Sequence, residues 1–299
     1  MMNPIRNILT VDVEDYFMVS AFSDIVNTDT WNHYSSRVER NTMRVLDLFS
    51  RSGAKGTFFI LGWIAERYPQ IVKEIDRRGH EIGCHSYHHK LVYEMSIEDF
   101  KEDTAKAKAI LENVIGKEVC GYRAPSYSIT KKSFWAMEVL RETGFLFDSS
   151  IFPIVHDRYG YPEFSRFPTV VETASGKILE IPMSTFRVWD KNIPVGGGGY
   201  LRLFPVSLTE WAIRKMNEEE KEAAIVYFHP WEIDSNQPRI NGSRLSRFRH
   251  YVNIERTEER IEHLLKTFSF GSVEDVHHGW IRLMAEEHEG GKSMCGKTL

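Results

Sequence analysis

Segments typical of buried β-strands alternate with segments typical of amphipathic helices along most of this chain. The strand-like runs are residues 8–13, 57–61, 119–122, 145–147, 177–181 and 223–228, and one further strand leads into the histidine-rich segment at 79–89. This alternation predicts an α/β fold with a largely parallel sheet. Because 299 residues contain no internal repeat and no linker, we expect one large domain.

Other segments predict local structure around this core. Pairs typical of helix N-termini are Ser36 with Glu39, Ser96 with Asp99, and Ser207 with Glu210. Residues 151–202 interrupt the alternation with Pro, Gly and aromatic residues and could shape a binding groove. The glycine run within them, at 196–199, lacks the GK[ST] ending of a phosphate loop and predicts a flexible lid or a tight turn. Residues 237–251 are basic and are expected to form a loop, and the polar tail at 286–299 is expected to be disordered.

Composition excludes several classes of partner. The net charge is −4 and the charges are mixed along the chain, so there is no basic stripe for nucleic acid and no polybasic membrane anchor. There is no run of eighteen apolar residues, and the N-terminus carries charge where a signal peptide would be apolar, so we expect a soluble protein without an export signal. Three cysteines without a CxxC pair suit a reducing compartment.

Two histidines four residues apart follow a strand end in the segment GHEIGCHSYHH. If the chain turns into a helical loop there, His85 and His89 project from one face and can bind a single divalent ion. The alternative is an accidental spacing, because the chain contains twelve histidines. Carboxylates and a further histidine at other strand ends favour the metal site.

The first predicted strand ends in the acidic sequence VDVED. Asp12 and Glu14 lie two residues apart on an extended segment, so their side chains leave the same face, whereas Asp15 points away unless the strand has turned. In a hydrolytic site an ion takes two histidines and one carboxylate and lowers the pKa of a water toward about 7. The other carboxylate can then take the proton. The alternative interpretation is that solvated acids merely end the strand.

Three more polar side chains stand at predicted strand ends. Arg123 could hold the base carboxylate by a bidentate hydrogen bond, or be a surface arginine in a turn next to Pro125. His229 could donate a proton to a leaving amine or alcohol, or be a structural histidine. Asp148 could orient His229 through its second ring nitrogen, or cap the following turn.

Five short motifs together resemble the polysaccharide deacetylases of the NodB-homology group, carbohydrate esterase family four. They are TVDVEDYF, HSYHH, RAPSY, FDSS and YFHP, in the family's order over about residues 8–230. The pattern after them, HPWEID and QPRINGSRLSRFRHYVN, resembles the subgroup found with exosortase-linked exopolysaccharide gene clusters. One departure is that Asp12 is separated from Glu14 and Asp15, where the common form has two adjacent Asp. Alternation along the strand, which puts Glu14 on the same face as Asp12, favours Glu14 as the metal carboxylate, and Asp15 is the alternative.

The resemblance implies a distorted (β/α) barrel of seven or eight strands with the active site at the C-terminal strand ends. It implies one domain over residues 1–285, with a core at 8–230 and a subgroup extension at 231–285. His85, His89 and Glu14 would bind a divalent ion, most simply Zn²⁺. Asp12, held by Arg123, would be the base, and a backbone N–H near Tyr127, in the loop of Pro125, would stabilise the oxyanion. His229, oriented by Asp148, would protonate the departing amine.

The implied activity is removal of N-acetyl groups from N-acetylhexosamine units of a polysaccharide or its precursor, so the expected partner is an acetylated glycan. Two alternatives remain: an amidohydrolase of a small cyclic imide or formamide, and a non-catalytic glycan-binding protein of an export assembly. The set Asp12, His85, His89, Arg123 and His229 favours an enzyme, because a binding protein needs neither a base nor an acid. We expect the protein in the cytoplasm or at the inner face of the membrane.

Overall fold

A computed structural model describes residues 5–295, with side chains to residue 287. Its main sheet has nine strands in the order β10-β1-β2-β3-β4-β5-β7-β6, with β11 also paired to β1. The strands are β1 (Asn7–Val13), β2 (Thr57–Ile60), β3 (Glu81–Cys84), β4 (Gly121–Tyr122), β5 (Phe147–Asp148), β6 (Thr169–Thr173), β7 (Gly176–Glu180), β10 (Ile225–Phe228) and β11 (Phe270–Gly271). A separate hairpin joins β8 (Thr185–Val188) to β9 (Lys191–Pro194).

The path from β10 through β1, β2, β3, β4 and β5 to β7 pairs in parallel at every step, and β6 is an antiparallel edge strand. This parallel path confirms the expected α/β fold. Loop segments fill the gap between β7 and β10: Ile225 N–H donates to Ser184 Oγ at 2.7 Å, and Tyr227 N–H donates to Gly196 O at 2.8 Å. The result is a barrel closed partly by irregular chain.

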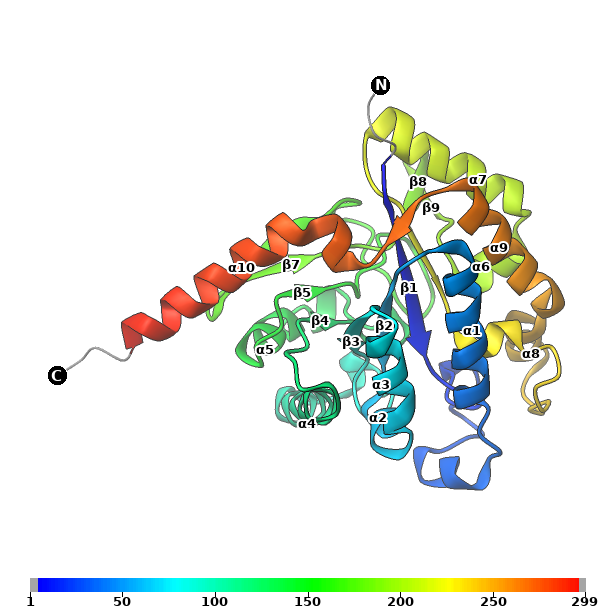
Figure 1. The fold of residues 1–299 in the computed structure, drawn as a ribbon, viewed down its shortest axis with the longest axis horizontal. Coiled ribbons are helices and arrows are strands. Elements are labelled where there is room, and N and C mark those ends of the chain that lie inside the picture. The colour runs from blue at the N-terminus through cyan, green and yellow to red at the C-terminus, as the bar shows by residue number, and fades with distance from the viewer. Residues whose placement is uncertain (1–4, 296–299) are drawn as a thin grey trace.

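Helices surround the strands, as Figure 1 shows, and the last helix extends away from the body of the molecule. They are α1 (Val38–Ser52), α2 (Gly62–Arg67), α3 (Pro69–Arg77), α4 (Ile97–Ile115), α5 (Ala136–Glu142), α6 (Gly198–Leu203), α7 (Val206–Lys215), α8 (Arg244–Tyr251), α9 (Thr257–Thr267) and α10 (Val273–Cys295). No described helix is both long enough and apolar enough to span a bilayer.

Alternation along β1 separates the inside of the barrel from its outside. Leu9, Val11 and Val13 belong to the core cluster under the helices, whereas Ile8 packs with barrel-interior rings such as Phe59 and Phe147. Side chains two apart on a strand share a face, so Asp12 and Glu14 continue the inward row that Ile8 begins. The strand therefore delivers both carboxylates to the open end of the barrel.

Several local expectations are corrected. Ser36 does not cap a helix: α1 begins at Val38, and Ser36 Oγ donates to Asp15 Oδ2 at 2.8 Å. Ser207 lies inside α7, whose N-cap is Pro205. The expected start at Ser96 is confirmed, since its side chain accepts from Asp99 N–H.

Three irregular segments also differ from expectation. The glycine run is neither lid nor simple turn, because Gly197 bridges to Tyr227 of β10 so closely that a Cβ would lie 1.9 Å from the Tyr227 carbonyl oxygen. The basic segment at 237–251 contains helix α8 instead of only loop. Helix α10 extends to Cys295, through the expected tail, and residues 296–299 lie outside the described residues.

Candidate metal centre

Glu14, His85 and His89 converge at the C-terminal ends of β1 and β3. His85 Nε2 lies 3.1 Å and His89 Nε2 lies 2.9 Å from Glu14 Oε1, and one ligand atom of each residue falls within 4.8 Å of the other two. All three side chains are buried. Burial alone would raise the pKa of Glu14, but the neighbouring His89 and His229 hold it well below its usual value. Two imidazole nitrogens and a carboxylate oxygen are the donor set of a hydrolytic zinc site.

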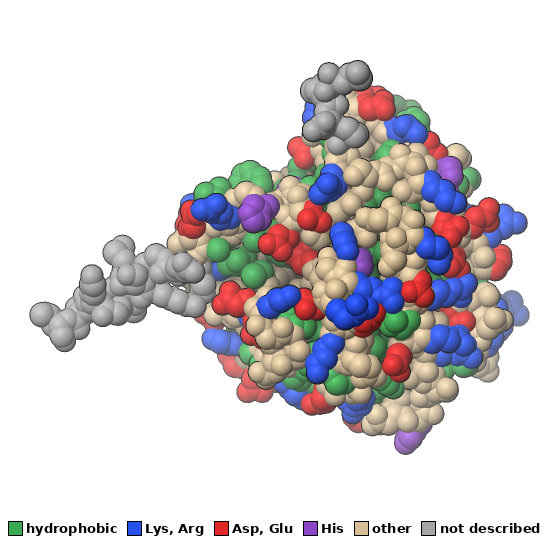
Figure 2. Space-filling view, in the orientation of Figure 1, with side chains coloured by type: hydrophobic (Ala, Val, Ile, Leu, Met, Phe, Trp, Pro, Cys, Tyr) green, Lys and Arg blue, Asp and Glu red, His purple; other side chains and the backbone are tan. Residues whose placement is uncertain are grey.

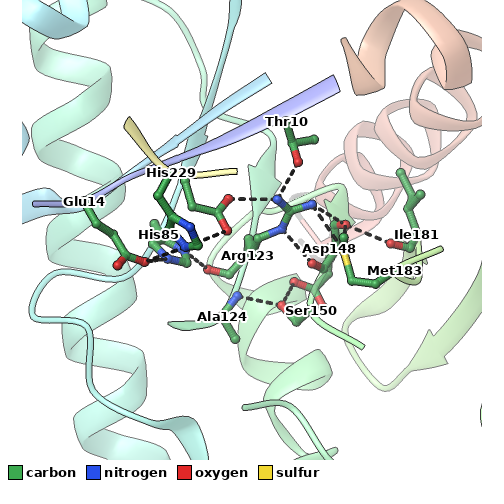
Figure 3. A network of polar contacts seen from close by, with 12 residues as sticks. Thr10, Glu14, His85, Arg123, Ala124, Asp148, Ser150, Ile181, Met183 and His229 are labelled. Atoms are coloured by element: carbon green, nitrogen blue, oxygen red, sulfur yellow. Dashed lines mark hydrogen bonds and ion pairs between the residues drawn. The ribbon is translucent and has the colours of Figure 1, made fainter. Parts of the chain in front are cut away.

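The orientation of His85 also fits a metal ligand. Its Nδ1 lies 2.7 Å from the carbonyl oxygen of Arg123, which accepts a hydrogen bond only if Nδ1 carries the proton. Nε2 is then left with a lone pair that faces Glu14, as Figure 3 shows. In the loop that follows, Ser86 and His89 adopt positive φ angles of 68° and 56°. Non-glycine residues held in this region are typical of functional sites.

Asp12 lies beside this cluster and is hydrogen-bonded to a buried arginine. Arg123 Nη1 donates to Asp12 Oδ1 at 2.8 Å and to Thr10 Oγ1 at 2.7 Å. The other two guanidinium nitrogens, Nε and Nη2, donate to the carbonyl oxygen and the hydroxyl of Ser149. Burial opposes the charge of Arg123, but Asp12 outweighs it and raises the pKa of the guanidinium. The expected Arg123–Asp12 contact is therefore present, through one guanidinium nitrogen instead of two.

His229 follows β10, the strand that pairs directly with β1, and faces both carboxylates. Its Nε2 lies 3.6 Å from Glu14 Oε1 and 4.0 Å from Asp12 Oδ2. Its Nδ1 lies 2.6 Å from Glu232 Oε1, in the short 3₁₀ turn Pro230–Ile233 that follows β10. Burial opposes protonation of His229, but Glu14 and Glu232 raise its pKa to about 9.

The partner of His229 is Glu232 and not Asp148, which corrects the sequence prediction. Glu232 is buried, and Arg202 Nε of α6 donates to its second oxygen at 2.5 Å. Burial would raise the pKa of Glu232, but Arg202 and His229 lower it to about 2. The spacing His-Pro-Trp-Glu could have indicated Glu232, since a carboxylate three residues after a strand-end His reaches back across a tight turn. Nothing local in the sequence indicated Arg202.

Asp148 is instead paired with Glu180, its register neighbour on β7. Asp148 Oδ1 accepts from Ser150 Oγ at 2.5 Å and Glu180 Oε1 accepts from the Ile151 N–H at 2.9 Å. The other two oxygens, Asp148 Oδ2 and Glu180 Oε2, are buried without another polar partner. Burial raises the pKa of Asp148 to about 6 and that of Glu180 well above its usual value, to which repulsion from Asp148 adds. The two carboxyls thus hold a proton between them.

This pair predicts a loss of stability with rising pH. Folding raises both pKa values, so above about pH 4 the folded pair holds protons that the unfolded chain has released, and stability falls as pH rises through about 6 and beyond. Glu180→Gln replaces the shared proton by a permanent amide donor. We expect the free energy of unfolding of this variant, relative to that of the wild type, to rise by roughly 1–2 kcal/mol between pH 4 and pH 7. Denaturant titrations at each pH measure it. Glu172→Gln, at an exposed position of β6, is the control, and parallel curves for all three proteins would refute the shared proton.

Asp15, the alternative metal carboxylate, serves a structural role. Its Oδ2 accepts hydrogen bonds from Ser36 Oγ and from the N–H groups of Arg37 and Val38, at 2.8, 2.7 and 3.1 Å. Its Oδ1 accepts from the Tyr16 N–H at 2.9 Å. Asp15 therefore caps the N-terminus of α1, where a carboxylate also complements the helix dipole. Its oxygens are occupied by these donors, and Asp15 is not part of the cluster of Glu14, His85 and His89.

Asp15→Asn and Glu14→Gln should have opposite effects. The amide nitrogen introduced by Asp15→Asn would place a donor against other donors, so this change should lower the free energy of unfolding by about 2 kcal/mol while zinc affinity stays at the wild-type value. Glu14→Gln should lose zinc affinity, because it removes the carboxylate from the metal donor set. Zinc titration and thermal unfolding of both proteins measure this, and loss of zinc by Asp15→Asn would reverse the assignment.

Pro125 and Tyr127 form the expected rigid turn after β4, in the 3₁₀ segment Pro125–Tyr127. Tyr127 has a φ of 53°, and its ring packs edge-on against Tyr227 at 5.1 Å. Its N–H donates to Ala124 O at 3.1 Å, so this amide must give up that bond before it can bind an oxyanion. The oxyanion role of this backbone stays a prediction.

A cavity of about 600 Å³ opens over these groups. Asp12, Glu14, His89 and His229 line its floor, and Tyr127 lines one wall. The 151–202 insertion supplies another wall through residues 155–159 and 198–200 and Arg202, and α8 supplies the rim. The volume suits a small ligand or one or two sugar units, which meets the expectation of a groove shaped by the insertion.

Comparison with known proteins shows what this chain is similar to. A sequence family described as polysaccharide deacetylase matches residues 25–145, and a domain of unknown function, DUF3473, matches residues 149–278. A peptidoglycan-N-acetylglucosamine deacetylase of Bacillus cereus is 34% identical over 98 residues, which are 32% of this chain and 36% of the relative. A peptidoglycan deacetylase of Helicobacter pylori is 29% identical over 108 residues, 36% of each chain. The chain thus matches little more than a third of the length of these relatives.

Solved structures agree on the fold. A polysaccharide deacetylase structure from Mycobacterium smegmatis superposes with a TM-score of 0.58 at 18% identity, covering 95% of this chain and 96% of that one. One from Pseudomonas aeruginosa PAO1 gives a TM-score of 0.58 at 16% identity, covering 93% and 91%. Residues 25–145 thus match the polysaccharide deacetylase family, and the solved deacetylase structures share the fold of the chain.

Proposed function

We propose that the protein is a metal-dependent deacetylase that hydrolyses the N-acetyl amide of N-acetylhexosamine units in a glycan. The observation that carries this proposal is the grouping of Glu14, His85 and His89 with Asp12 and His229 on the floor of one cavity. A base, an acid and a metal donor set within hydrogen-bond reach of one reacting centre suit amide hydrolysis. The relatives named as peptidoglycan deacetylases support the same chemistry.

Each side chain has a role that follows from its contacts. A divalent ion held by Glu14, His85 and His89 would supply Lewis acidity to the carbonyl and the attacking water. Asp12 takes the proton of that water, and Arg123 holds Asp12 in place. His229 then gives a proton to the departing amine nitrogen, and Glu232 fixes the orientation of its ring.

Zinc is the proposed ion, because two histidines, one carboxylate and an open position are typical of catalytic zinc. The amine product would stay on the glycan and acetate would leave. The link to exosortase-associated exopolysaccharide clusters and the single-domain boundary at residue 285 stay predictions.

Acetate release tests the proposal. Zinc-loaded protein is incubated with N-acetylglucosamine oligomers and with peptidoglycan, beside a chelator-treated sample and the same sample after zinc is restored. We expect release that disappears with the chelator and returns with zinc. Protein with one equivalent of bound zinc that releases no acetate, yet hydrolyses a small formamide or cyclic imide, would favour the amidohydrolase alternative. Glycan binding without any hydrolysis would favour the binding protein.

A further inference from the structure

The rim of the cavity carries exposed apolar side chains that catalysis does not use. Leu245 and Phe248 of α8 are 57% and 55% exposed, and Val155 of the insertion is 87% exposed. All three line the cavity that contains the metal ligands. Leu245 and Phe248 are three residues apart and therefore lie on one face of the helix. An apolar patch at the mouth of an active site marks an interaction surface.

Helix α8 is held at the rim by its opposite face. His250 is buried and stacks on Trp231 at 4.1 Å, and it also packs against Phe22 at 5.0 Å. Its Nε2 lies 2.8 Å from Gln237 Oε1. The outward position of Leu245 and Phe248 is thus fixed by the packing of the inner face.

The charged side chains of the segment that carries α8 are all basic. Between Ser235 and Asn253 the sequence contains no Asp or Glu, and its arginines are Arg239, Arg244, Arg247 and Arg249. All four are exposed, and Arg158 of the insertion is exposed beside them. Asp157, the acid that faces this group, lies 3.6 Å from Arg249. The face in Figure 2 does not show this bias as a whole, since acidic and basic side chains are interspersed over it.

We infer that the α8 rim docks on an anionic membrane surface. Outward leucine and phenylalanine flanked by arginines are typical of helices that lie in a bilayer interface, with the apolar side chains in the headgroup boundary. Arginines beside them gain from the negative surface potential of anionic lipids. Docked in this way, the mouth of the cavity faces the headgroups, so its substrate would be a glycan carried on a lipid anchor. This consequence for the substrate rests on the proposed function, whereas docking itself does not.

Co-sedimentation with vesicles tests docking without any turnover. The full chain is mixed with phosphatidylcholine vesicles, with or without phosphatidylglycerol, at low and high salt. We expect binding to the anionic vesicles that weakens with salt. Leu245→Ser with Phe248→Ser should weaken partitioning by tenfold or more, because two apolar side chains no longer enter the interface. Arg244→Gln with Arg247→Gln should weaken it roughly tenfold.

A matched apolar pair exists on α10. Trp280 and Leu283 are also three residues apart and are 48% and 53% exposed, but acids such as Glu274 and Glu286 lie on the same helix. Helix α10 lies on the opposite side of the molecule from α8 in Figure 1. Trp280→Ser with Leu283→Ser should therefore keep vesicle binding within about twofold of the wild type.

Three results would overturn the inference. The first is no binding of the wild type to anionic vesicles at low salt. The second is an equal loss of binding in the α10 variant. The third is a change of oligomeric state in the Leu245→Ser and Phe248→Ser variant with vesicle binding intact, which would make the rim a contact between copies of the chain. Because none of these depends on acetate release, docking and the proposed activity can fail separately.

Discussion

Asp12→Asn should lower kcat by about 10³-fold while zinc remains bound. Asparagine has the shape of aspartate and keeps an oxygen for the Arg123 Nη1 donor, which lies 2.8 Å from Oδ1. It cannot accept a proton from water, so the step that generates the nucleophile loses its base. Binding of substrate should change little, because Asp12 acts on the water and not on the glycan. We therefore expect the loss in kcat and a nearly constant KM.

Steady-state kinetics and metal analysis of the same preparation check this result. The buried guanidinium of Arg123 loses its ion partner in the variant, so a lower free energy of unfolding, by about 1–3 kcal/mol, is expected as well. Assays well below the unfolding temperature keep this effect out of the rates. A turnover within tenfold of the wild type, at full zinc content, would show that another group takes the proton.

The parts of the site that the sequence predicted follow from two geometric rules. Side chains two apart on a strand share a face, which placed Asp12 and Glu14 together and sent Asp15 to the helix. The C-terminal ends of parallel strands meet at one edge, which brought His85 and His89 to Glu14 and Arg123 to Asp12. Both rules need only the positions of the strands, and the alternating pattern supplies those.

The parts that the sequence missed depend on contacts between distant segments. Glu180 reaches Asp148 because β5 pairs with β7, and not with β6, which is the next strand along the chain. Arg202 reaches Glu232 from α6, which lies in the insertion. The insertion has no hydrophobic periodicity from which its path could have been predicted. Ser36 matched a helix N-cap, yet Asp15 from a different segment occupied that helix terminus instead. Competition between local and distant partners for one polar group is not encoded in a local pattern.

Two residues have been assigned as the partner that orients His229, Asp148 from the sequence and Glu232 from the structure, and variants of the two can be told apart. If Glu232 orients the imidazole, Glu232→Ala should lower kcat roughly 100-fold, because the ring loses the acceptor 2.6 Å from Nδ1. Glu232→Gln keeps an oxygen acceptor but removes the charge, so it should retain more activity. Its kcat should also fall at a lower pH on the alkaline side, since Glu232 is one of the carboxylates that raise the pKa of His229.

Asp148→Asn is the matched control, because Asp148 is the residue that the motif pattern assigned to His229 and its carboxyl is paired with Glu180 instead. We expect this variant to keep kcat within about threefold and to leave the alkaline limb of the pH profile in place. The pH profiles of kcat and KM for Glu232→Gln and Asp148→Asn decide the question. An alkaline limb that moves in Asp148→Asn and stays in Glu232→Gln would restore the original assignment. Movement in Glu232→Gln alone would mean that this domain positions its acid from the turn after β10, and not from β5.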